Sequence, residues 1–283
     1  MDGFETPIVQ QALPRSSVNS LAINTSYYEV GAGRGEPILL LHGMSSSGDS
    51  FRELMAALAS EFWLIAPDIP GFGYSENTTP YTFPHLVEWL AAFSSQLQVR
   101  PAHILGHSFG GALGVSFALA YPSDVQSLIL LAPSILRPGK YPEWLRHLSK
   151  TTLAEHVLQL GVAASRLILQ RQMRAAFYEP RRFEAELWKR RARDYEQARA
   201  SAAVLRASAL HDIRADLAQI QQRSCIIWGQ NDPVLDPADA RRLSDLMPKS
   251  RTTLHLLPEC GHVPQIEQQN RVIQVVRSFL DGQ

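Results

Sequence analysis

The chain contains 283 residues, of which 45% are hydrophobic and 19% are charged. This length suits one large α/β domain with an insertion, and the composition excludes a largely disordered chain. Because 27 basic and 27 acidic residues cancel to a formal net charge of zero, the overall basic character expected of a nucleic-acid-binding protein is also excluded.

The N-terminal stretch MDGFETPIVQQALPRSS contains acids and prolines but no basic segment followed by an apolar run, unlike a secretory signal peptide. No uninterrupted apolar run approaches the ~20 residues that a membrane-spanning helix requires. We therefore expect a soluble, cytoplasmic protein without a membrane span; the sequence indicates no oligomeric state. Cys225 and Cys260 fall on different predicted strands and lack the spacing of a redox or zinc motif, so we expect reduced packing residues.

Two runs near the N-terminus, SVNSLAI and SYYEV, predict an antiparallel pair of strands joined near Asn24 at one edge of a sheet. The stretch GAGRG that follows predicts a turn rather than a dinucleotide site, because it precedes a strand instead of opening a helix. Runs rich in Ile, Leu and Val then predict six buried strands, at residues 37–43, 62–68, 102–108, 125–133, 224–232 and 251–259. Helical patterns fit between them, at residues 50–59, 84–97, 109–121, 236–246 and 265–280. This alternation predicts an α/β fold whose mostly parallel sheet is covered by helices on both faces.

The alternation is interrupted once, at residues 137–222, where amphipathic helical patterns occur without any strand pattern. We expect this segment to form a helical cap between a first core part, residues 1–136, and a second, residues 223–283. Thr152 and Glu155 fit a capping box at one helix start, and Pro180 fits the first turn of another. Residues 137–223 hold 17 Lys and Arg against 9 Asp and Glu. Most of these cations are expected on solvated outer faces, but an Arg facing a cleft would favour anionic substrates.

The segment AHILGHSFGGALG places Gly106, Ser108 and Gly110 in a G-x-S-x-G pattern between a predicted strand and a predicted helix. A serine at so sharp a turn has a strained backbone, and small neighbours relieve the crowding around it. The turn exposes the Ser108 hydroxyl above the carboxyl ends of the strands, beside a helix N-terminus. This context favours a nucleophilic serine, with the backbone N–H of Phe109 as one donor to an oxyanion.

A serine nucleophile needs a base, and the base needs an acid to orient it. His262 follows the last predicted strand, in PECGHVPQIE, so a loop can bring its imidazole to the same sheet edge as Ser108. Asp232 ends the preceding predicted strand, in IIWGQNDPVLD, and gives the chain order Ser, Asp, His. Asp236 is the alternative acid, although its place beside Pro237 favours an N-cap of the next helix.

Two loops are expected to complete the site. In LLLHGMSSSGDSF, Gly43 permits a turn and the backbone N–H of Met44 supplies the second oxyanion donor, while His42 orients the loop. The stretch PDIPGFGYSEN is expected to support the same site through Asp68, Gly71, Gly73 and Ser75.

His103 and His107 lie four residues apart, but on a strand this spacing does not create the helical face of a zinc site. Packing is the favoured role for both histidines.

These motifs together resemble the α/β-hydrolase superfamily over nearly the whole chain outside the predicted cap. They are the H-G loop at residues 42–43, D-x-P-G-x-G-x-S at 68–75, G-H-S-F-G-G at 106–111, G-x-x-D at 229–232 and C-G-H at 260–262. The resemblance implies a serine hydrolase with a Ser108, Asp232 and His262 triad that uses neither a metal nor an organic cofactor. Capped esterases and carbon-carbon bond hydrolases are the most similar branches; proline iminopeptidases and cofactor-free haloperoxidases or perhydrolases are more distant.

Two departures separate these branches. The serine distinguishes the chain from haloalkane dehalogenases and epoxide hydrolases, which have aspartate there. Many carbon-carbon hydrolases carry Asn before the serine and Trp after the histidine, where this chain has His107 and Val263. The resemblance therefore favours a small-molecule carboxylic ester as substrate. A carbon-carbon bond hydrolase of meta-cleavage type and a small-molecule receptor on the same fold remain the alternatives.

Overall fold

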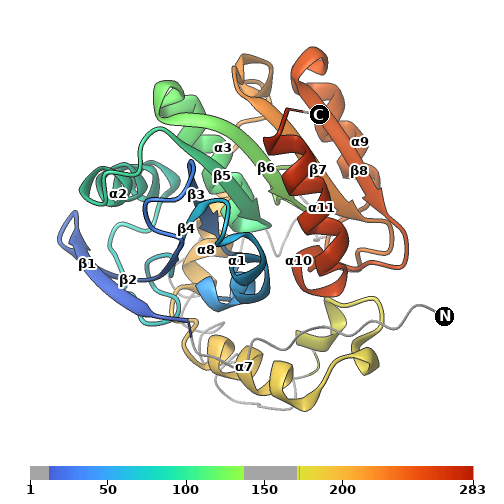
Figure 1. Cartoon of the computed structure of the whole chain (residues 1–283), viewed down its shortest axis with the longest axis horizontal. Helices are drawn as coiled ribbons and strands as arrows, with labels where there is room; N and C mark the ends of the chain where they lie inside the picture. The colour runs from blue at the N-terminus through green and yellow to red at the C-terminus, as the bar shows by residue number, and fades with distance from the viewer. Residues whose placement is uncertain (1–12, 137–170, 172, 283) are drawn as a thin grey trace.

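A sheet of eight strands forms the centre of the computed structural model, which describes residues 13–136, 171 and 173–282. Its strands are β1 (Arg15–Ser20), β2 (Ile23–Val30), β3 (Pro37–Leu41), β4 (Trp63–Pro67), β5 (Ala102–His107), β6 (Val125–Leu131), β7 (Arg223–Gly229) and β8 (Thr252–Leu257). They lie in the order β1-β2-β4-β3-β5-β6-β7-β8. The β1–β2 and β2–β4 pairings are antiparallel and the others are parallel. The predicted mostly parallel sheet, with an antiparallel pair at one edge, is confirmed (Figure 1).

The turn between β1 and β2 differs from its prediction. Leu21 and Ala22, with φ of 52° and 59°, form the turn, whereas Asn24 pairs with Asn19 inside the strands. A two-residue hairpin often needs positive φ at both central positions. Asn tolerates positive φ, so an Asn between two strand patterns suggests such a turn. Here β2 pairs with strands on both sides, and this pairing holds Asn24 in the ladder. The expected turn near Asn24 is therefore wrong by about two residues.

The central parallel strands are buried on both faces, so their successive side chains enter two separate apolar cores. In β3, Leu39 and Leu41 belong to one core and Ile38 and Leu40 to the other. The first core includes side chains of α2 (Phe83–Gln96), α3 (Phe109–Ala120) and α9 (Ala238–Leu246). The second includes side chains of α1 (Arg52–Leu58) and α11 (Gln269–Leu280). Helices therefore cover both faces of the sheet, as predicted (Figure 1).

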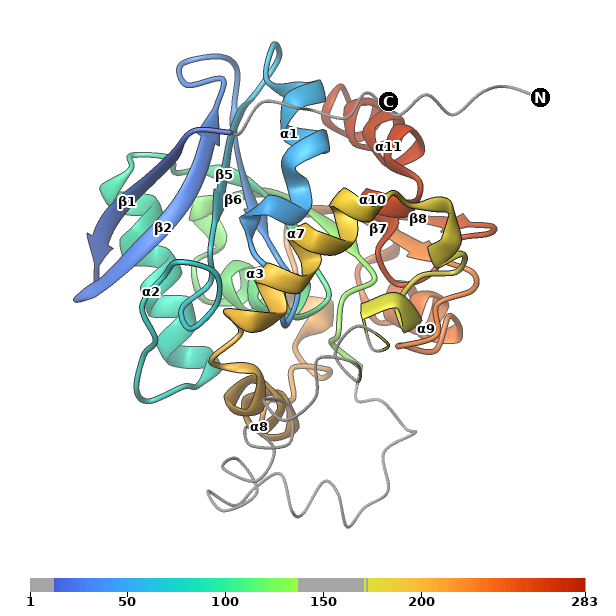
Figure 2. The same cartoon turned by 90° about the horizontal axis from the view of Figure 1, so that it is seen from below.

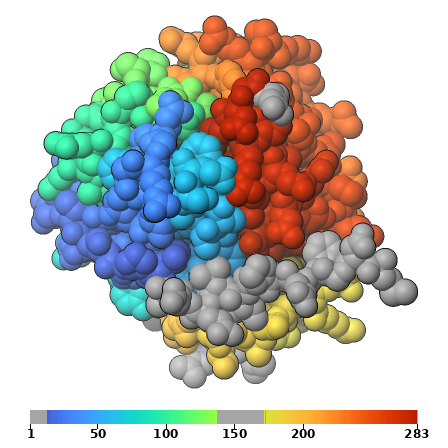
Figure 3. Space-filling model, viewed as in Figure 1, coloured from blue at the N-terminus to red at the C-terminus, as the bar shows by residue number. Residues whose placement is uncertain are grey.

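The last helical segment is broken rather than continuous. α10 (Pro264–Glu267) is followed by Gln268, whose φ of −133° and ψ of 52° are not helical, before α11 begins. The single helix predicted over residues 265–280 is therefore wrong at this point. After the break, α11 lies beside α1 (Figure 3). Arg277 of α11 pairs with Glu61, just beyond the end of α1, at 2.7 Å.

Residues 171 and 173–222 are the described part of the predicted cap and are called the inserted segment below. Residues 137–170 lie outside the described residues, and with them the predicted capping box of Thr152 and Glu155. The inserted segment contains α7 (Ala185–Glu196) and α8 (Ser201–Leu210) and, in its described residues, no strand. α7 lies across the end of the sheet to which the parallel strands point (Figure 2). Pro180 begins a short 3-10 helix, as expected for a first-turn proline.

Five 3-10 helices complete the described elements: η1 (Gly48–Phe51), η2 (Pro122–Asp124), η3 (Pro180–Arg182), η4 (Leu217–Gln219) and η5 (Lys249–Arg251). Cys225 lies on β7, but Cys260 lies in the loop after β8 rather than on a strand as predicted. Both thiols are buried and free. None of the described helices is long and apolar enough to cross a membrane.

Candidate active site

Ser108 occupies the turn between β5 and α3 with φ of 50° and ψ of −115°. This left-handed conformation is strained for a residue with a side chain, so the surrounding backbone must enforce it. The Ser108 N–H donates to the carbonyl of Leu131 at 3.0 Å, and its own carbonyl accepts from Ser134 at 3.0 Å. A Cβ at Gly106 would lie 2.6 Å from the Gly110 carbonyl oxygen, and one at Gly110 would lie 2.1 Å from the Leu41 carbonyl oxygen. Only glycine fits at either position.

The structure brings Ser108, His262 and Asp232 into one hydrogen-bonded line. The distance from Ser108 Oγ to His262 Nε2 is 3.0 Å, and His262 Nδ1 lies 2.8 Å from Asp232 Oδ2. The Asp232 carboxylate is fully buried, and its other oxygen accepts from the amides of Val234 and Leu235 at 2.8 and 2.9 Å. This arrangement leaves the Nδ1 proton facing Asp232 and the Nε2 lone pair facing the hydroxyl, so the ring can accept the serine proton.

Asp236, the alternative acid, lies away from this line. Its Oδ1 accepts from the amide of Ala238 at 3.0 Å, at the start of α9. The N-cap predicted at Asp236 is therefore wrong by one residue, because Pro237 is the N-cap of α9 and Asp236 binds the first helical amide from the position before it.

The H-G loop leaves the sheet after β3 and lies against the serine turn. A Cβ at Gly43 would be 3.2 Å from Cβ of Ser108 and 2.8 Å from Nδ1 of His107, so glycine permits this approach. His42 is fully buried; its Nδ1 donates to the Gly43 carbonyl at 2.7 Å and its Nε2 accepts from the Ile69 amide at 2.9 Å. Burial lowers the pKa of His42 to about 4, so the neutral ring orients the loop without carrying charge.

The two amides expected to bind an oxyanion lie on this loop and at the start of α3. Within the described residues, neither the Met44 nor the Phe109 amide donates to a protein acceptor. An N–H group at a helix N-terminus is unpaired by geometry and attracts negative charge. Among the described residues, both donors therefore lack a protein acceptor and suit an oxyanion on a ligand at Ser108.

His107 holds the backbone of His262, a contact that sequence reasoning missed when it assigned simple packing. Its Nε2 donates to the carbonyl of His262 at 2.8 Å, and burial lowers the pKa of His107 well below its usual value, so the ring is neutral. Nothing in the sequence indicates this contact except the position of His107 directly before the serine.

Glu267 is a second residue that sequence reasoning missed. Its carboxylate accepts from the amides on both sides of His262, those of Gly261 at 3.0 Å and Val263 at 3.1 Å. It also accepts from the amide of Tyr178 in the inserted segment at 2.8 Å. Burial raises the pKa of Glu267. A Cβ at Gly261 would lie 2.6 Å from the Tyr178 nitrogen, so the close approach of the inserted segment requires glycine there.

The loop after β4 supports the H-G loop through Asp68, as its motif suggests. The buried Asp68 carboxylate accepts from the amides of Gly48 and Tyr74, each at 2.9 Å, and pairs with Arg15 at 2.6 Å. Gly73 has φ of 50°, and a Cβ there would lie 2.3 Å from Asp68. Asp68 therefore links Gly48, at the end of the loop that begins at His42, to the turn that contains Gly73 and Tyr74.

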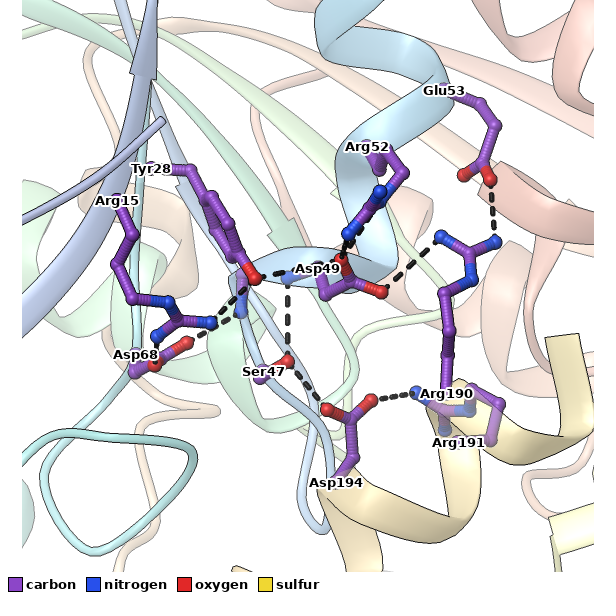
Figure 4. A network of polar contacts seen from close by, with 11 residues as sticks. Arg15, Tyr28, Ser47, Asp49, Arg52, Glu53, Asp68, Arg190, Arg191 and Asp194 are labelled. Carbon is purple, nitrogen blue, oxygen red and sulfur yellow. Dashed lines mark hydrogen bonds and ion pairs between the residues drawn. The ribbon is translucent and has the colours of Figure 1, made fainter. Parts of the chain in front are cut away.

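The inserted segment meets the core through a network of charged side chains (Figure 4). Arg190 on α7 pairs with Asp49 at 3.2 Å and with Glu53 at 2.6 Å. Arg191 and Asp194, also on α7, are 3.3 Å apart and both buried. These two arginines have acidic protein partners, so they differ from the solvated outer cations that the sequence predicts for most of the segment.

Asp194 provides a prediction about stability. Burial raises the pKa of Asp194 from 3.8 to about 6, with smaller contributions in the same direction from Asp49 and Asp68. Arg191 and the hydrogen bond to Ser47 act in the opposite direction. The folded state then keeps the proton over a pH range in which the unfolded state has lost it. We expect the unfolding free energy of wild type, minus that of Asp194→Asn, to fall by ~1.4 kcal/mol per pH unit between 3.8 and about 6. Above about pH 6 this difference in unfolding free energy should not change with pH.

Urea unfolding of both proteins at intervals from pH 4 to 8 measures this difference. A difference that rises with pH would show instead that pairing with Arg191 outweighs the burial of the carboxylate.

A family model described as the α/β hydrolase fold matches residues 36–269 of the chain. The chain is 27% identical to 2-hydroxy-6-oxo-2,4-heptadienoate hydrolase of Pseudomonas putida F1, over 91% of this chain and 93% of that protein. It is also 27% identical to lipase 1 of Psychrobacter immobilis, over 91% of this chain and 81% of the lipase. Among solved structures, the meta-cleavage product hydrolase CumD of Pseudomonas fluorescens IP01 has a TM-score of 0.77 and 25% identity, over 94% of this chain and 97% of that one. The chain therefore belongs to the α/β-hydrolase fold family.

Proposed function

We propose that this protein is a serine hydrolase that cleaves carboxylic esters through an acyl-enzyme intermediate. The observation that carries the proposal is the hydrogen-bonded line from the Ser108 hydroxyl through His262 to the buried carboxylate of Asp232. In this proposal Ser108 is the nucleophile, His262 transfers the protons and Asp232 orients the histidine. The tautomer required for proton transfer is the one that the Asp232 contact favours.

The reaction proceeds in two halves. Ser108 Oγ attacks the ester carbonyl carbon while His262 Nε2 takes the hydroxyl proton, and the amides of Met44 and Phe109 bind the oxyanion that forms. His262 then gives this proton to the departing alcohol, which leaves the acyl group on Ser108. A water molecule repeats the attack with His262 as base, and the carboxylic acid leaves as the serine hydroxyl is restored. None of these steps requires a metal or a cofactor.

His107 and Val263 support ester cleavage over the alternative. They occupy the positions where many carbon-carbon hydrolases have Asn and Trp, and here a neutral imidazole bound to the His262 carbonyl and a buried aliphatic side chain occupy them. The relatives nevertheless include proteins named for both reactions. Hydrolysis of a vinylogous diketone acid, the alternative, uses the same Ser108, His262 and Asp232.

A substrate panel tests this proposal. We expect p-nitrophenyl esters of increasing acyl length to be hydrolysed with multiple turnovers, at a kcat/KM at least ten-fold above that for a 2-hydroxy-6-oxo-dienoate. The same preparation of Ser108→Ala serves as the control for contaminating esterases. A larger kcat/KM for the dienoate would favour carbon-carbon hydrolysis, and a single slow turnover with a retained adduct would favour a small-molecule receptor.

A further inference from the structure

Three consecutive serines follow Met44, and each of them is bound by a different side chain of the inserted segment. Ser45 Oγ lies 2.9 Å from Ser201 Oγ at the start of α8. Ser46 Oγ accepts from Arg191 at 2.7 Å, and Ser47 Oγ donates to Asp194 at 2.6 Å. We call these three contacts the serine clamp; Figure 4 shows the contact between Ser47 and Asp194.

Two of the three contacts, those of Ser46 and Ser47, are buried, which makes their loss costly. Ser46 and Ser47 are each 2% exposed, and Arg191 and Asp194 are each 7% exposed. If α7 moved away from the loop, the Ser46 and Ser47 hydroxyls would lose their partners on α7 together, and the buried Asp194 would lose Ser47 while keeping Arg191 on the same helix. The loop and α7 therefore keep one arrangement relative to each other.

The loop conformation itself is strained and depends on outside support. Ser45 has φ of 55°, a left-handed value that is unfavourable for serine. Such a residue persists when several contacts fix its neighbours, and the contacts of all three serines to α7 and α8 provide them. On the far side, Asp68 binds the amide of Gly48, so the loop is held at both ends.

The clamp begins at the residue after Met44, whose amide is the proposed oxyanion donor. Gly43, on the other side of Met44, lies against Ser108. An oxyanion donor acts at about 2.7–3.1 Å, so a displacement on the order of 1 Å weakens it severely. A displacement of α7 would therefore displace the Met44 amide, because only a short stretch of backbone separates Met44 from the serines that α7 binds.

We infer that Asp194 is a positioning residue which, through Ser47, sets the loop that carries the Met44 amide and so couples the inserted segment to the oxyanion hole. The inference rests on the proposed function and extends it to a residue far from the reacting atoms. Arg191 and Ser201 act in the same way through Ser46 and Ser45.

The same helix offers a matched control. Arg190 on α7 pairs with Glu53 on α1, a residue outside the serine loop. The second partner of Arg190, Asp49, is unchanged in Glu53→Gln. Glu53→Gln removes the negative charge from a contact between the same two parts of the protein. It should leave kcat within two-fold of wild type.

The experiment compares Asp194→Ala, Ser47→Ala, the double variant and Glu53→Gln with p-nitrophenyl acetate as substrate. We expect Asp194→Ala and Ser47→Ala each to lower kcat by on the order of ten-fold with KM within two-fold, because the loss falls on the transition state. The double variant should be no worse than the more damaged single variant, since both changes break one contact. Ser47→Ala keeps the Arg191–Asp194 pair and is the second variant if Asp194→Ala fails to fold.

A trifluoromethyl ketone, 1,1,1-trifluoro-4-phenylbutan-2-one, provides a readout that general destabilisation does not produce. Its adduct on Ser108 carries an oxyanion, so its inhibition constant should rise by the same factor as kcat falls, at a temperature where all variants are folded by circular dichroism. Folded variants with wild-type kcat, losses that add in the double variant, or an equal loss in Glu53→Gln would each overturn the inference. In those cases turnover by wild type and its absence in Ser108→Ala would leave the proposed function standing. A wild-type protein without turnover would overturn both.

Discussion

Ser108→Ala is expected to abolish ester turnover and to leave the fold unchanged. The hydroxyl lies at the turn with its Oγ toward His262 and contributes little apolar packing, while the backbone contacts of the residue do not depend on the side chain. By analogy with other serine triads, kcat should fall by roughly 10⁴ to 10⁶. Steady-state kinetics of a preparation free of host esterases measures the loss, and circular dichroism checks the fold.

Covalent labelling provides the companion measurement. A fluorophosphonate should add its mass to one peptide, the one that contains Ser108, and Ser108→Ala should not be labelled. Residual activity comparable to wild type, or labelling at another serine, would mean that Ser108 is not the nucleophile.

Asp232→Asn is expected to lower kcat by up to ~10⁴, whereas Asp236→Asn should change it less than two-fold. The amides of Val234 and Leu235 both donate to Oδ1 of residue 232, so an asparagine would keep its carbonyl oxygen there. Its NH₂ group would then face Nδ1 of His262. That nitrogen would have to accept, which moves the ring proton to Nε2 and blocks acceptance of the serine proton.

Asp236→Asn is the matched control because it removes a carboxylate four residues away while retaining an oxygen that can accept from the Ala238 amide. Kinetics at saturating p-nitrophenyl acetate compare the two variants, and equal melting temperatures exclude unfolding as the cause. If Asp236→Asn alone were inactive, the acid would have to be reassigned.

The main elements of the fold could be predicted because their signals are local. The apolar runs of β3, β5 and β6 occur where the sequence predicts them, since strands buried on both faces need continuous Ile, Leu and Val. Their predicted carboxyl ends extend too far, because residues such as His42 and Gly43 leave the sheet to form the loops of the site. The turn at Leu21 and Ala22 has no local signal, because it follows from strand pairing.

The candidate site likewise combines features that the sequence predicts with features that only the tertiary structure shows. The G-x-S-x-G turn around Ser108 and the chain order of Asp232 and His262 are properties of short segments and of the order of strands, so the sequence alone was sufficient to nominate these residues. Only the tertiary structure decided which acid reaches His262 and what holds the loops around it. Asp194 lies 147 positions from Ser47, and His107 lies 155 positions from His262. A hydroxyl, carboxylate or imidazole carries no mark of such a distant partner, because the specificity of the contact arises only when packing excludes water and brings both groups together.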